Sequence, residues 1–218
     1  MKRSFFISRN LSESSLLLNF LKDNEWEVHC QSLIEIEPVN FNIETETDWI
    51  FISSSNGARI LLESYYPTIN TKIGVVGAAT GKTVKQFGFE PTFIGTPGDM
   101  EKVGAAFAKV LGHDSVLFVG ADGGSEKLRN CLHANQVSFV PIYSTKLLTN
   151  QDLPITDVVY LTSPSNAEAY LSVNSLIGKT VIVIGNTTAE FLELKGIENI
   201  LIPKSPKEED VVELIKSL

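Results

Sequence analysis

The sequence predicts an α/β protein in which parallel sheets are covered by helices on both faces. Apolar runs of strand length alternate with segments of helical periodicity along the whole chain. The apolar runs are mostly uninterrupted, which is typical of strands buried on both faces of a parallel sheet. Two long stretches of the chain also repeat each other, so the same order of strands and helices is expected twice.

The predicted elements follow from this alternation. The β-rich runs predict strands at residues 4–8, 27–33, 49–52, 72–76, 91–94, 115–119, 137–143, 158–161, 180–184 and 199–202. Helical periodicity is present at residues 11–22, 99–111, 125–134 and 207–218. Many helical segments open with Asn, Ser, Thr or Asp, whose side chains cap helix N-termini.

The repeat has two parts. TDWIFISSSNGARILL at Thr47–Leu62 returns as TDVVYLTSPSNAEAYL at Thr156–Leu171, with an offset of 109 residues. VGAATGKTVKQFG at Val76–Gly88 is matched by IGNTTAEFLELKG at Ile184–Gly196, with an offset of 108 residues. Each copy therefore contains an apolar run that ends in hydroxyl residues, followed by a second apolar run that ends in Gly-x-x-Thr.

The early part of the chain is echoed as well. Residues 4–33 resemble residues 115–143, so the chain reads as unit A, unit B, unit A and unit B. Such a chain either forms two successive A–B lobes or exchanges partners so that the first A joins the last B. Periodicity alone leaves both arrangements open. The polar or proline-bearing stretches 35–42 and 144–154 are the candidate linkers and hinges.

Composition and charge restrict the class of protein. With 218 residues, 43% of them apolar, the chain can form one large or two small packed domains. A net charge of −8 and an isoelectric point near 4.9 argue against nucleic acid as a partner. The apolar stretch after Met1–Arg3 is too short for a secretion signal, and no run approaches the ~20 residues of a membrane span, so a cytoplasmic protein is expected. Cys30 and Cys131 lie in no metal or redox spacing and are expected in the core.

Hydroxyl residues stand where the strands of the two B units end. They are Ser53, Ser54, Ser55, Thr80, Thr162, Ser163, Thr187 and Thr188. Ligands of parallel sheets bind outside the carboxyl ends of the strands, next to helix N-termini with free backbone amides. These turns therefore predict an uncharged anion site for a large ligand with several anionic groups. The alternative is that each Ser or Thr only caps its own helix.

Other kinds of chemistry are not indicated. The stretch Gly77–Thr83 ends like a P-loop, but its spacing is one residue short and the copy at Gly185 lacks the lysine. His29, His113 and His133 have no nucleophile motif around them and are interpreted as structural. The sequence has no metal spacing and no dinucleotide fingerprint, which predicts chemistry without a cofactor.

A series of motifs runs in order along the chain. The series is Asp48-x-x-x-x-Ser53-Ser54, Gly77-x-x-Thr80, Tyr143-Ser144-Thr145, Asp157-x-x-x-x-Thr162-Ser163-Pro164 and Ile184-Gly185-x-Thr187-Thr188, closing on Gly196. In this order and at this length, the motifs resemble those of the uroporphyrinogen-III synthase family.

The resemblance implies a fold with two α/β lobes. Each lobe would have a parallel sheet flanked by helices, of flavodoxin-like or doubly wound type, and a two-stranded linker would join them. The first A unit would pack with the last B unit. Residues 1–36 and 146–218 would then form a discontinuous lobe, residues 41–142 an inserted lobe, and residues 37–40 and 143–145 the linkers.

The resemblance also implies a reaction. Hydroxymethylbilane, which carries eight carboxylates, would lose water and close to uroporphyrinogen III, with its last pyrrole ring inverted through a spiro intermediate. The protein would act by holding one substrate conformation in a closing cleft, without a cofactor. Tyr143 would donate a hydrogen bond or a proton to the leaving hydroxyl. Substrate-binding roles fall on Arg9, Ser53, Ser54, Thr80, Ser163, Thr187 and Thr188.

Two alternatives remain open from the sequence. Arg9 could instead cap a helix or form a surface ion pair. The whole protein could be a non-catalytic, two-lobed binding protein for a polyanionic small molecule, since such a protein needs the same turns. The family implies a monomer that makes at most transient contact with hydroxymethylbilane synthase.

Overall fold

The computed structural model describes residues 2–44, 46–124 and 126–218. Met1 and Ser125, which enter the expectations above, lie outside these ranges. The chain divides into two compact units. Met1–Glu35 and Lys146–Leu218 form one, called here the discontinuous unit, and Ile36–Thr145 forms the other, called the inserted unit.

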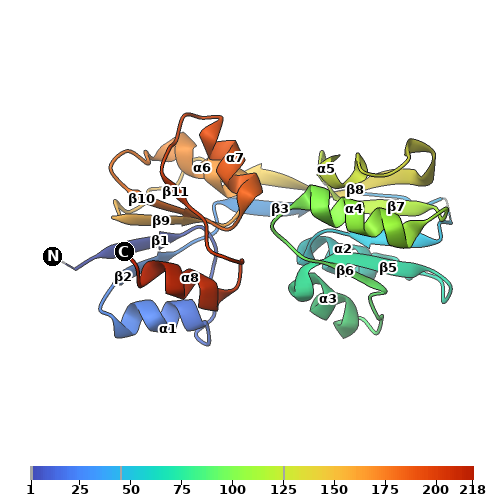
Figure 1. Cartoon of the computed structure of the whole chain (residues 1–218), viewed down its shortest axis with the longest axis horizontal. Coiled ribbons are helices and arrows are strands. Elements are labelled where there is room, and N and C mark those ends of the chain that lie inside the picture. Colours follow the sequence, from blue (N-terminus) through green and yellow to red (C-terminus); the bar gives the residue numbers. More distant parts are fainter. Residues whose placement is uncertain (1, 45, 125) are drawn as a thin grey trace. The chain divides into compact units, whose positions relative to one another are not determined.

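The discontinuous unit contains a five-stranded parallel sheet in the order β11-β10-β9-β1-β2. Its strands are β1 (Ser4–Ile7), β2 (Glu27–Cys30), β9 (Val158–Leu161), β10 (Thr180–Val183) and β11 (Ile200–Leu201). Helices cover both faces (Figure 1). One pair is α1 (Leu16–Asp23) and α8 (Glu208–Ile215), and the other pair is α6 (Pro164–Val173) and α7 (Asn186–Glu193).

Successive strand residues of this sheet point to opposite faces, as β geometry requires. Phe5 and Tyr160 pack in the cluster that includes α1 and α8. Phe6 and Val159 pack in the cluster that includes α6 and α7. Both faces are thus buried, which explains why the strands read as uninterrupted apolar runs.

The inserted unit contains a six-stranded sheet in the order β3-β8-β7-β4-β5-β6. Its strands are β3 (Ile34–Pro38), β4 (Trp49–Ile52), β5 (Lys72–Val76), β6 (Phe93–Gly95), β7 (Val116–Ala121) and β8 (Val137–Leu147). One face is covered by α2 (Ser55–Ser64) and α3 (Gly77–Gln86), and the other by α4 (Met100–Leu111) and α5 (Glu126–Arg129). A 3-10 turn, η1 (Ala134–Gln136), precedes β8.

Aromatic side chains fill the α4 face of this sheet. The ring centroids of Phe51 and Phe107 are 4.6 Å apart, and those of Phe51 and Phe118 are 5.0 Å apart. Gly74 lies beside this group on β5, where an added Cβ would come within 2.6 Å of the Phe51 ring. The close approach explains why a glycine stands in a strand that is otherwise rich in β-branched residues.

The two sheets have the same strand order once β3 is set aside. In both, the strands of the A unit, β1 and β2 or β7 and β8, lie at one side and the three strands of a B unit lie at the other. Counted from the A unit, each sheet has the order 2-1-3-4-5, which is the flavodoxin-like order. The first A unit therefore pairs with the last B unit, because β1 is hydrogen-bonded to β9. The predicted α/β class is confirmed.

The two crossings between the units contain strands, as the two-stranded linker implied by the resemblance requires, whereas the polar pattern of 35–42 and 144–154 did not indicate them. β3 covers residues 35–38 of the stretch 35–42, and β8 continues through 143–145 to Leu147. The two pair antiparallel, since Val39 N donates to Ile142 O at 3.1 Å and Leu148 N donates to Leu33 O at 2.9 Å. Most β3 side chains are half-buried or exposed, so the hydrophobic pattern that marks the other strands is weak there.

Three local expectations need correction. The first helix begins at Leu16 rather than residue 11, because Ser15 caps it by accepting from Leu18 N at 3.1 Å. The helix expected over 125–134 is the single turn α5 followed by η1. Cys30 and Cys131 are half-buried rather than in the core, and burial raises the pKa of the Cys30 thiol.

Candidate functional site

The strand order marks one position in each unit where a ligand is expected. In a flavodoxin-like sheet this switch point lies at the carboxyl ends of the first and third strands. It falls between β7 and β4 in the inserted unit and between β1 and β9 in the discontinuous unit. Ser53 and Ser54 follow β4, and Thr162 and Ser163 follow β9, so these predicted site residues do flank the switch points.

Ser54 and Ser163 are helix N-caps. Ser54 Oγ accepts a hydrogen bond from Gly57 N at 3.0 Å at the start of α2. Ser163 Oγ accepts from Asn166 N at 3.1 Å at the start of α6. The capping role that the sequence left as an alternative is therefore present in both copies.

The two caps have different side-chain partners. Ser54 Oγ lies 3.0 Å from the Tyr143 hydroxyl, while Ser163 Oγ accepts a hydrogen bond from Asn166 Nδ2, also at 3.0 Å. Asn166 Oδ1 in turn accepts from Leu33 N at 2.9 Å. Tyr143 is only 7% exposed. The structure thus brings together two predicted residues, Ser54 and Tyr143.

The second turn of each B unit begins a helix without a side-chain cap. Gly77, with φ of +79°, opens α3 directly after β5, and Gly185 precedes α7. Their first backbone amides are therefore not engaged by a cap side chain, as an anion site requires. Because α3 starts at Gly77, Lys82 lies within the helix, and no loop exists that could wrap a triphosphate.

The predicted threonines of these turns differ in exposure. Thr80 and Thr188 lie in the first turns of α3 and α7 and are 4% and 1% exposed. Thr187, next in the chain to Thr188, is half-buried and more accessible. Thr187 is therefore the most accessible of the three threonines.

Arg9 lies just beyond β1 and is held by an ion pair. Its Nη2 atom is 3.3 Å from Glu208 Oε1, and both side chains are about one-third exposed. The other oxygen of Glu208 accepts from Ser15 Oγ at 2.9 Å and from Leu17 N at 3.1 Å. The ion-pair alternative for Arg9 is therefore present, although the arginine also stands at the switch point.

Tyr160 lies near this ion pair on β9. The Arg9 Cζ atom is 6.0 Å from the centre of its ring. Burial, with the nearby charges as smaller effects, raises the pKa of Tyr160 to about 12. The raised pKa keeps this phenol protonated. Within the described part of the chain, its hydroxyl has no hydrogen-bond partner.

Sequence reasoning missed Ser8, which ties the switch point of the discontinuous unit together. Ser8 Oγ accepts from Thr162 N at 2.9 Å and lies 3.1 Å from Thr162 Oγ1. Ser8 is fully buried. Its place directly after the first apolar run was the signal that could have identified it, because the same pattern marks Thr162.

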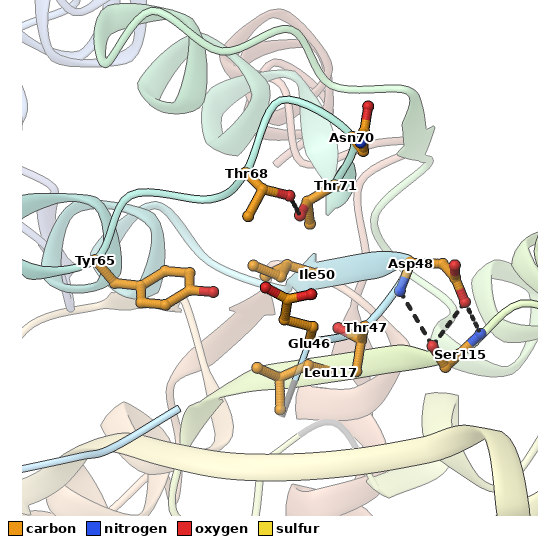
Figure 2. A pocket seen from close by; sticks show the side chains of 10 residues that line it. All are labelled: Glu46, Thr47, Asp48, Ile50, Tyr65, Thr68, Asn70, Thr71, Ser115 and Leu117. Carbon is orange, nitrogen blue, oxygen red and sulfur yellow. Dashed lines mark hydrogen bonds between the residues drawn. The ribbon is translucent and has the colours of Figure 1, made fainter. Parts of the chain in front are cut away.

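The acidic residues of the repeat lie at the opposite edge of each sheet. Asp48 Oδ2 accepts from Ser115 N at 2.8 Å and from Ser115 Oγ at 2.7 Å, as Figure 2 shows. Asp157 Oδ2 makes the same two bonds to Ser4, both at 2.8 Å. These bonds hold the pKa of both carboxyls below its ordinary value.

A polar hollow of about 420 Å³ lies beside the Asp48 pair. Glu46, Thr68 and Thr71 line part of it (Figure 2). It opens where β4 and β7 begin, at the opposite edge of the sheet from Ser54. The hollow is therefore not part of the switch point, and the repeated aspartates are structural.

Neither a cluster of metal ligands nor a membrane-spanning helix is found among the described residues. Within residues 2–44, 46–124 and 126–218, no three His, Cys, Asp or Glu side chains gather as metal ligands would. None of the helices described there combines the length and the apolar character needed to cross a membrane.

Fold and turns define the class of the protein. It is a duplicated flavodoxin-like α/β protein with hydroxyl-capped helices at two switch points. The family model for "Uroporphyrinogen-III synthase HemD" matches residues 17–213. The chain belongs to the uroporphyrinogen-III synthase family, which confirms the resemblance found in the sequence.

Curated relatives agree with this family. The porphyrin biosynthesis protein HemD of Ruminiclostridium josui is 26% identical over 94% of this chain and 47% of its own length. The chloroplastic uroporphyrinogen-III synthase of Oryza sativa subsp. japonica is 27% identical over 77% of this chain and 62% of its own length. The chain thus spans about half the length of the first relative and less than two thirds of the second.

Solved structures share the fold. Uroporphyrinogen-III synthetase from Helicobacter pylori superposes with a TM-score of 0.67 at 22% identity, covering 100% of this chain and 99% of that one. A mutant uroporphyrinogen III synthase from Thermus thermophilus gives a TM-score of 0.62 at 11% identity, covering 99% of this chain and 98% of that one. At such identities the likeness concerns the fold alone.

Proposed function

We propose that this protein is a uroporphyrinogen-III synthase of tetrapyrrole biosynthesis. It converts hydroxymethylbilane to uroporphyrinogen III with loss of water and inversion of the last pyrrole ring. The observation that carries the proposal is the family match over residues 17–213, which includes the switch point of the inserted unit and the β9 side of the switch point in the discontinuous unit. The turns described above support it, because they offer amides and hydroxyls rather than metal ligands or a nucleotide loop.

The substrate is bound through its carboxylates at the turns of both units. The binding residues are Arg9, Ser53, Ser54, Thr80, Ser163, Thr187 and Thr188, together with the first amides of α3 and α7. A neutral hydrogen bond contributes ~1 kcal/mol and a favourable helix terminus up to ~2 kcal/mol. About six to eight such contacts outweigh the entropy lost on binding and leave roughly micromolar affinity, near −8 kcal/mol.

The net charge of −8 opposes the binding of a polyanion. However, charges farther from the substrate than a Debye length of ~8 Å are largely screened. The local amides and Arg9 therefore decide the affinity. The Glu208 carboxylate, which already pairs with Arg9, leaves the remaining guanidinium donors for a substrate carboxylate.

Catalysis consists mainly of holding one conformation of the bilane. The linear substrate can lose hydroxide and close without a protein, to the isomer in which no ring is inverted. Tyr143 donates its proton to the leaving hydroxyl as the carbon–oxygen bond breaks, so water departs. A pyrrole loses a proton when the macrocycle closes, and this proton replaces the one that Tyr143 gave up. No cofactor takes part.

The two units act as domains, and β3 and β8 are the connections between them. We place the protein in the cytoplasm as a monomer, in at most transient contact with hydroxymethylbilane synthase. Neither nucleic acid nor a membrane is a partner.

The proposal is tested with freshly generated hydroxymethylbilane. After reaction with the purified protein, the products are oxidised and the porphyrin isomers separated by chromatography. Isomer III as the main product supports the synthase. Isomer I alone, at the rate of the protein-free control, contradicts it. Slower loss of the bilane without conversion would indicate the alternative, a binding protein for the polyanion.

A further inference from the structure

Two corresponding caps have different surroundings in the two units. In the inserted unit the Ser54 hydroxyl meets a phenol, Tyr143, at 3.0 Å. In the discontinuous unit the Ser163 hydroxyl meets an amide, Asn166 Nδ2, at 3.0 Å. The repeat explains the difference, because position 57, a glycine, corresponds to Asn166.

Gly57 leaves the room that the phenol occupies. A Cβ at Gly57 would lie 3.2 Å from Ser54 Oγ and 3.6 Å from the Tyr143 ring. A longer side chain there would therefore take the place of Tyr143, as Asn166 does in the other unit. Beyond β2, the strand that corresponds to β8, the chain supplies Leu33, whose backbone N donates to Asn166. Only the inserted unit thus has a phenol at its cap.

Tyr143 is placed by a β-bulge. The pairing of β7 with β8 shifts between Gly120 and Ala121, so that Ala121 lies opposite Tyr143. Asp122 N also donates to the Tyr143 carbonyl at 3.0 Å. Bulges of this kind re-aim a side chain next to functional sites. The bulge fixes the phenol at the carboxyl end of β7, beside the cap of α2.

The hydrogen bond that Ser54 accepts from the α2 backbone favours donation of the Ser54 proton to Tyr143. Ser54 Oγ already accepts from Gly57 N at 3.0 Å, at the positive end of α2. A serine hydroxyl has one proton to donate, and accepting a bond makes that proton a better donor. A chain that runs from the Gly57 amide through Ser54 to the Tyr143 oxygen leaves the phenol proton available for donation to another group.

We propose that Ser54 is a positioning residue that donates its hydrogen bond to the Tyr143 oxygen and so aims the phenol proton at the substrate's leaving hydroxyl. The inference rests on the proposed synthase function and gives Ser54 a role other than carboxylate binding. When the carbon–oxygen bond of the substrate breaks, the electron pair stays on oxygen and takes the Tyr143 proton. The phenolate that forms is stabilised by the Ser54 proton until the pyrrole proton released on ring closure replaces the lost one.

The decisive variant is Ser54→Asp. An aspartate caps α2 as well as a serine does, but it only accepts hydrogen bonds, so it forces Tyr143 to donate towards the protein. We expect Ser54→Asp to keep its thermal midpoint while kcat at saturating bilane falls about tenfold, as one ordinary hydrogen bond predicts. Ser54→Thr keeps both the cap and the donor and is expected to retain most of kcat.

A double-mutant cycle separates orientation from charge. In a Tyr143→Phe background, Ser54→Asp is expected to lower kcat no further, because the proton that it would misdirect is gone. Ser163→Asp is the matched control, since it adds the same charge at the other cap. Both Asp variants raise KM for the polyanion, but the kcat effect of Ser163→Asp is expected to add to that of Tyr143→Phe. Full kcat in Ser54→Asp, or additivity with Tyr143→Phe, would overturn the proposal.

A measurement without substrate keeps this inference apart from the proposed function. The Raman doublet of tyrosine distinguishes a phenol that accepts a hydrogen bond from one that donates. The wild-type spectrum minus that of Tyr143→Phe isolates this one of the five tyrosines. An acceptor pattern that becomes a donor pattern in Ser54→Asp supports the inference. A donor pattern in the wild type overturns the inference even if isomer III is formed. If the wild type shows an acceptor pattern but forms no isomer III, only the proposed function is rejected.

Discussion

Asp48 and Asp157 hold corresponding corners of the two sheets. Each carboxylate accepts hydrogen bonds from the backbone and the hydroxyl of a serine on the neighbouring strand, Ser115 or Ser4. The pairs join β4 to β7 and β9 to β1, the strands that flank the switch points. They thus stabilise the strand spacing at the edge opposite the ligand turns.

These aspartates give a pH dependence of stability. The pKa of Asp157 lies below its ordinary value of 3.8, first because of the backbone hydrogen bond from Ser4. A carboxyl with a lowered folded pKa stabilises fully above its unfolded pKa and loses this contribution as pH falls through the folded value. The difference in urea midpoint between wild type and Asp157→Asn should therefore be constant above about pH 5 and shrink below about pH 4. A difference that grows on acidification would contradict this.

Tyr143→Phe removes one hydroxyl from a site that acts mainly by orientation. We expect kcat to fall about 10- to 100-fold, which is at or below the lower end of the usual contribution of a general acid, while isomer III stays the main product. Initial rates with freshly generated bilane check this. Tyr170→Phe is the matched control, because its hydroxyl is buried in the other unit and has no partner among the described residues. Wild-type turnover in Tyr143→Phe would remove the residue from the mechanism.

At the scale of elements, the helix N-termini of each unit form two types. α2 and α6 have serine caps, whereas α3 and α7 begin at glycine turns without a side-chain cap. A capped terminus uses its amides for stability, and an uncapped one keeps them for a ligand. Each B unit therefore has one helix whose N-terminus is capped by a serine and one whose first amides have no side-chain cap.

Removing the cap of α6 is expected to destabilise the protein. Ser163→Ala should lower the free energy of unfolding by about 1 kcal/mol, because Asn166 N and Nδ2 both lose their acceptor. Urea denaturation measures the change. Ser163→Thr, which keeps an acceptor, should lose less than half as much. An unchanged midpoint in Ser163→Ala would show that water replaces the cap at no cost.

The elements show what sequence reasoning could find. Strands β4 and β9 have the predicted bounds, because their four residues are all buried and read as pure apolar runs. β3 was assigned to a linker, since its alternating Ile and Glu are only partly buried. The Ser54–Tyr143 contact joins residues 89 positions apart through a bulge, which no local pattern contains.

At the scale of the whole molecule, both sheets have the same strand order apart from β3, and each combines an A unit with the B unit of the other half of the chain. The discontinuous unit takes its A strands from the start of the chain and its B strands from the end, while the inserted unit is continuous. The repeat in the sequence predicted both sheets but not the exchange, because either connectivity satisfies the same periodicity. The family resemblance implied the exchange, and the hydrogen bonding of β1 to β9 and of β4 to β7 shows it.

The inserted unit should fold when expressed alone. Residues 36–145 contain their own sheet and both hydrophobic clusters that cover it. We expect cooperative urea unfolding of this fragment, followed by circular dichroism, with lower stability than in the full chain because β3 and β8 are cut. A gradual, non-cooperative change would contradict the division of the chain into two domains.

The measurement that tests the central claim most directly is the initial rate of isomer III formation over a series of protein concentrations. A synthase predicts a rate proportional to protein concentration, with isomer I falling in the same proportion as the bilane is diverted from spontaneous closure. A yield of isomer III that stays at the protein-free level at every concentration would contradict the account and leave the two switch points as a binding site.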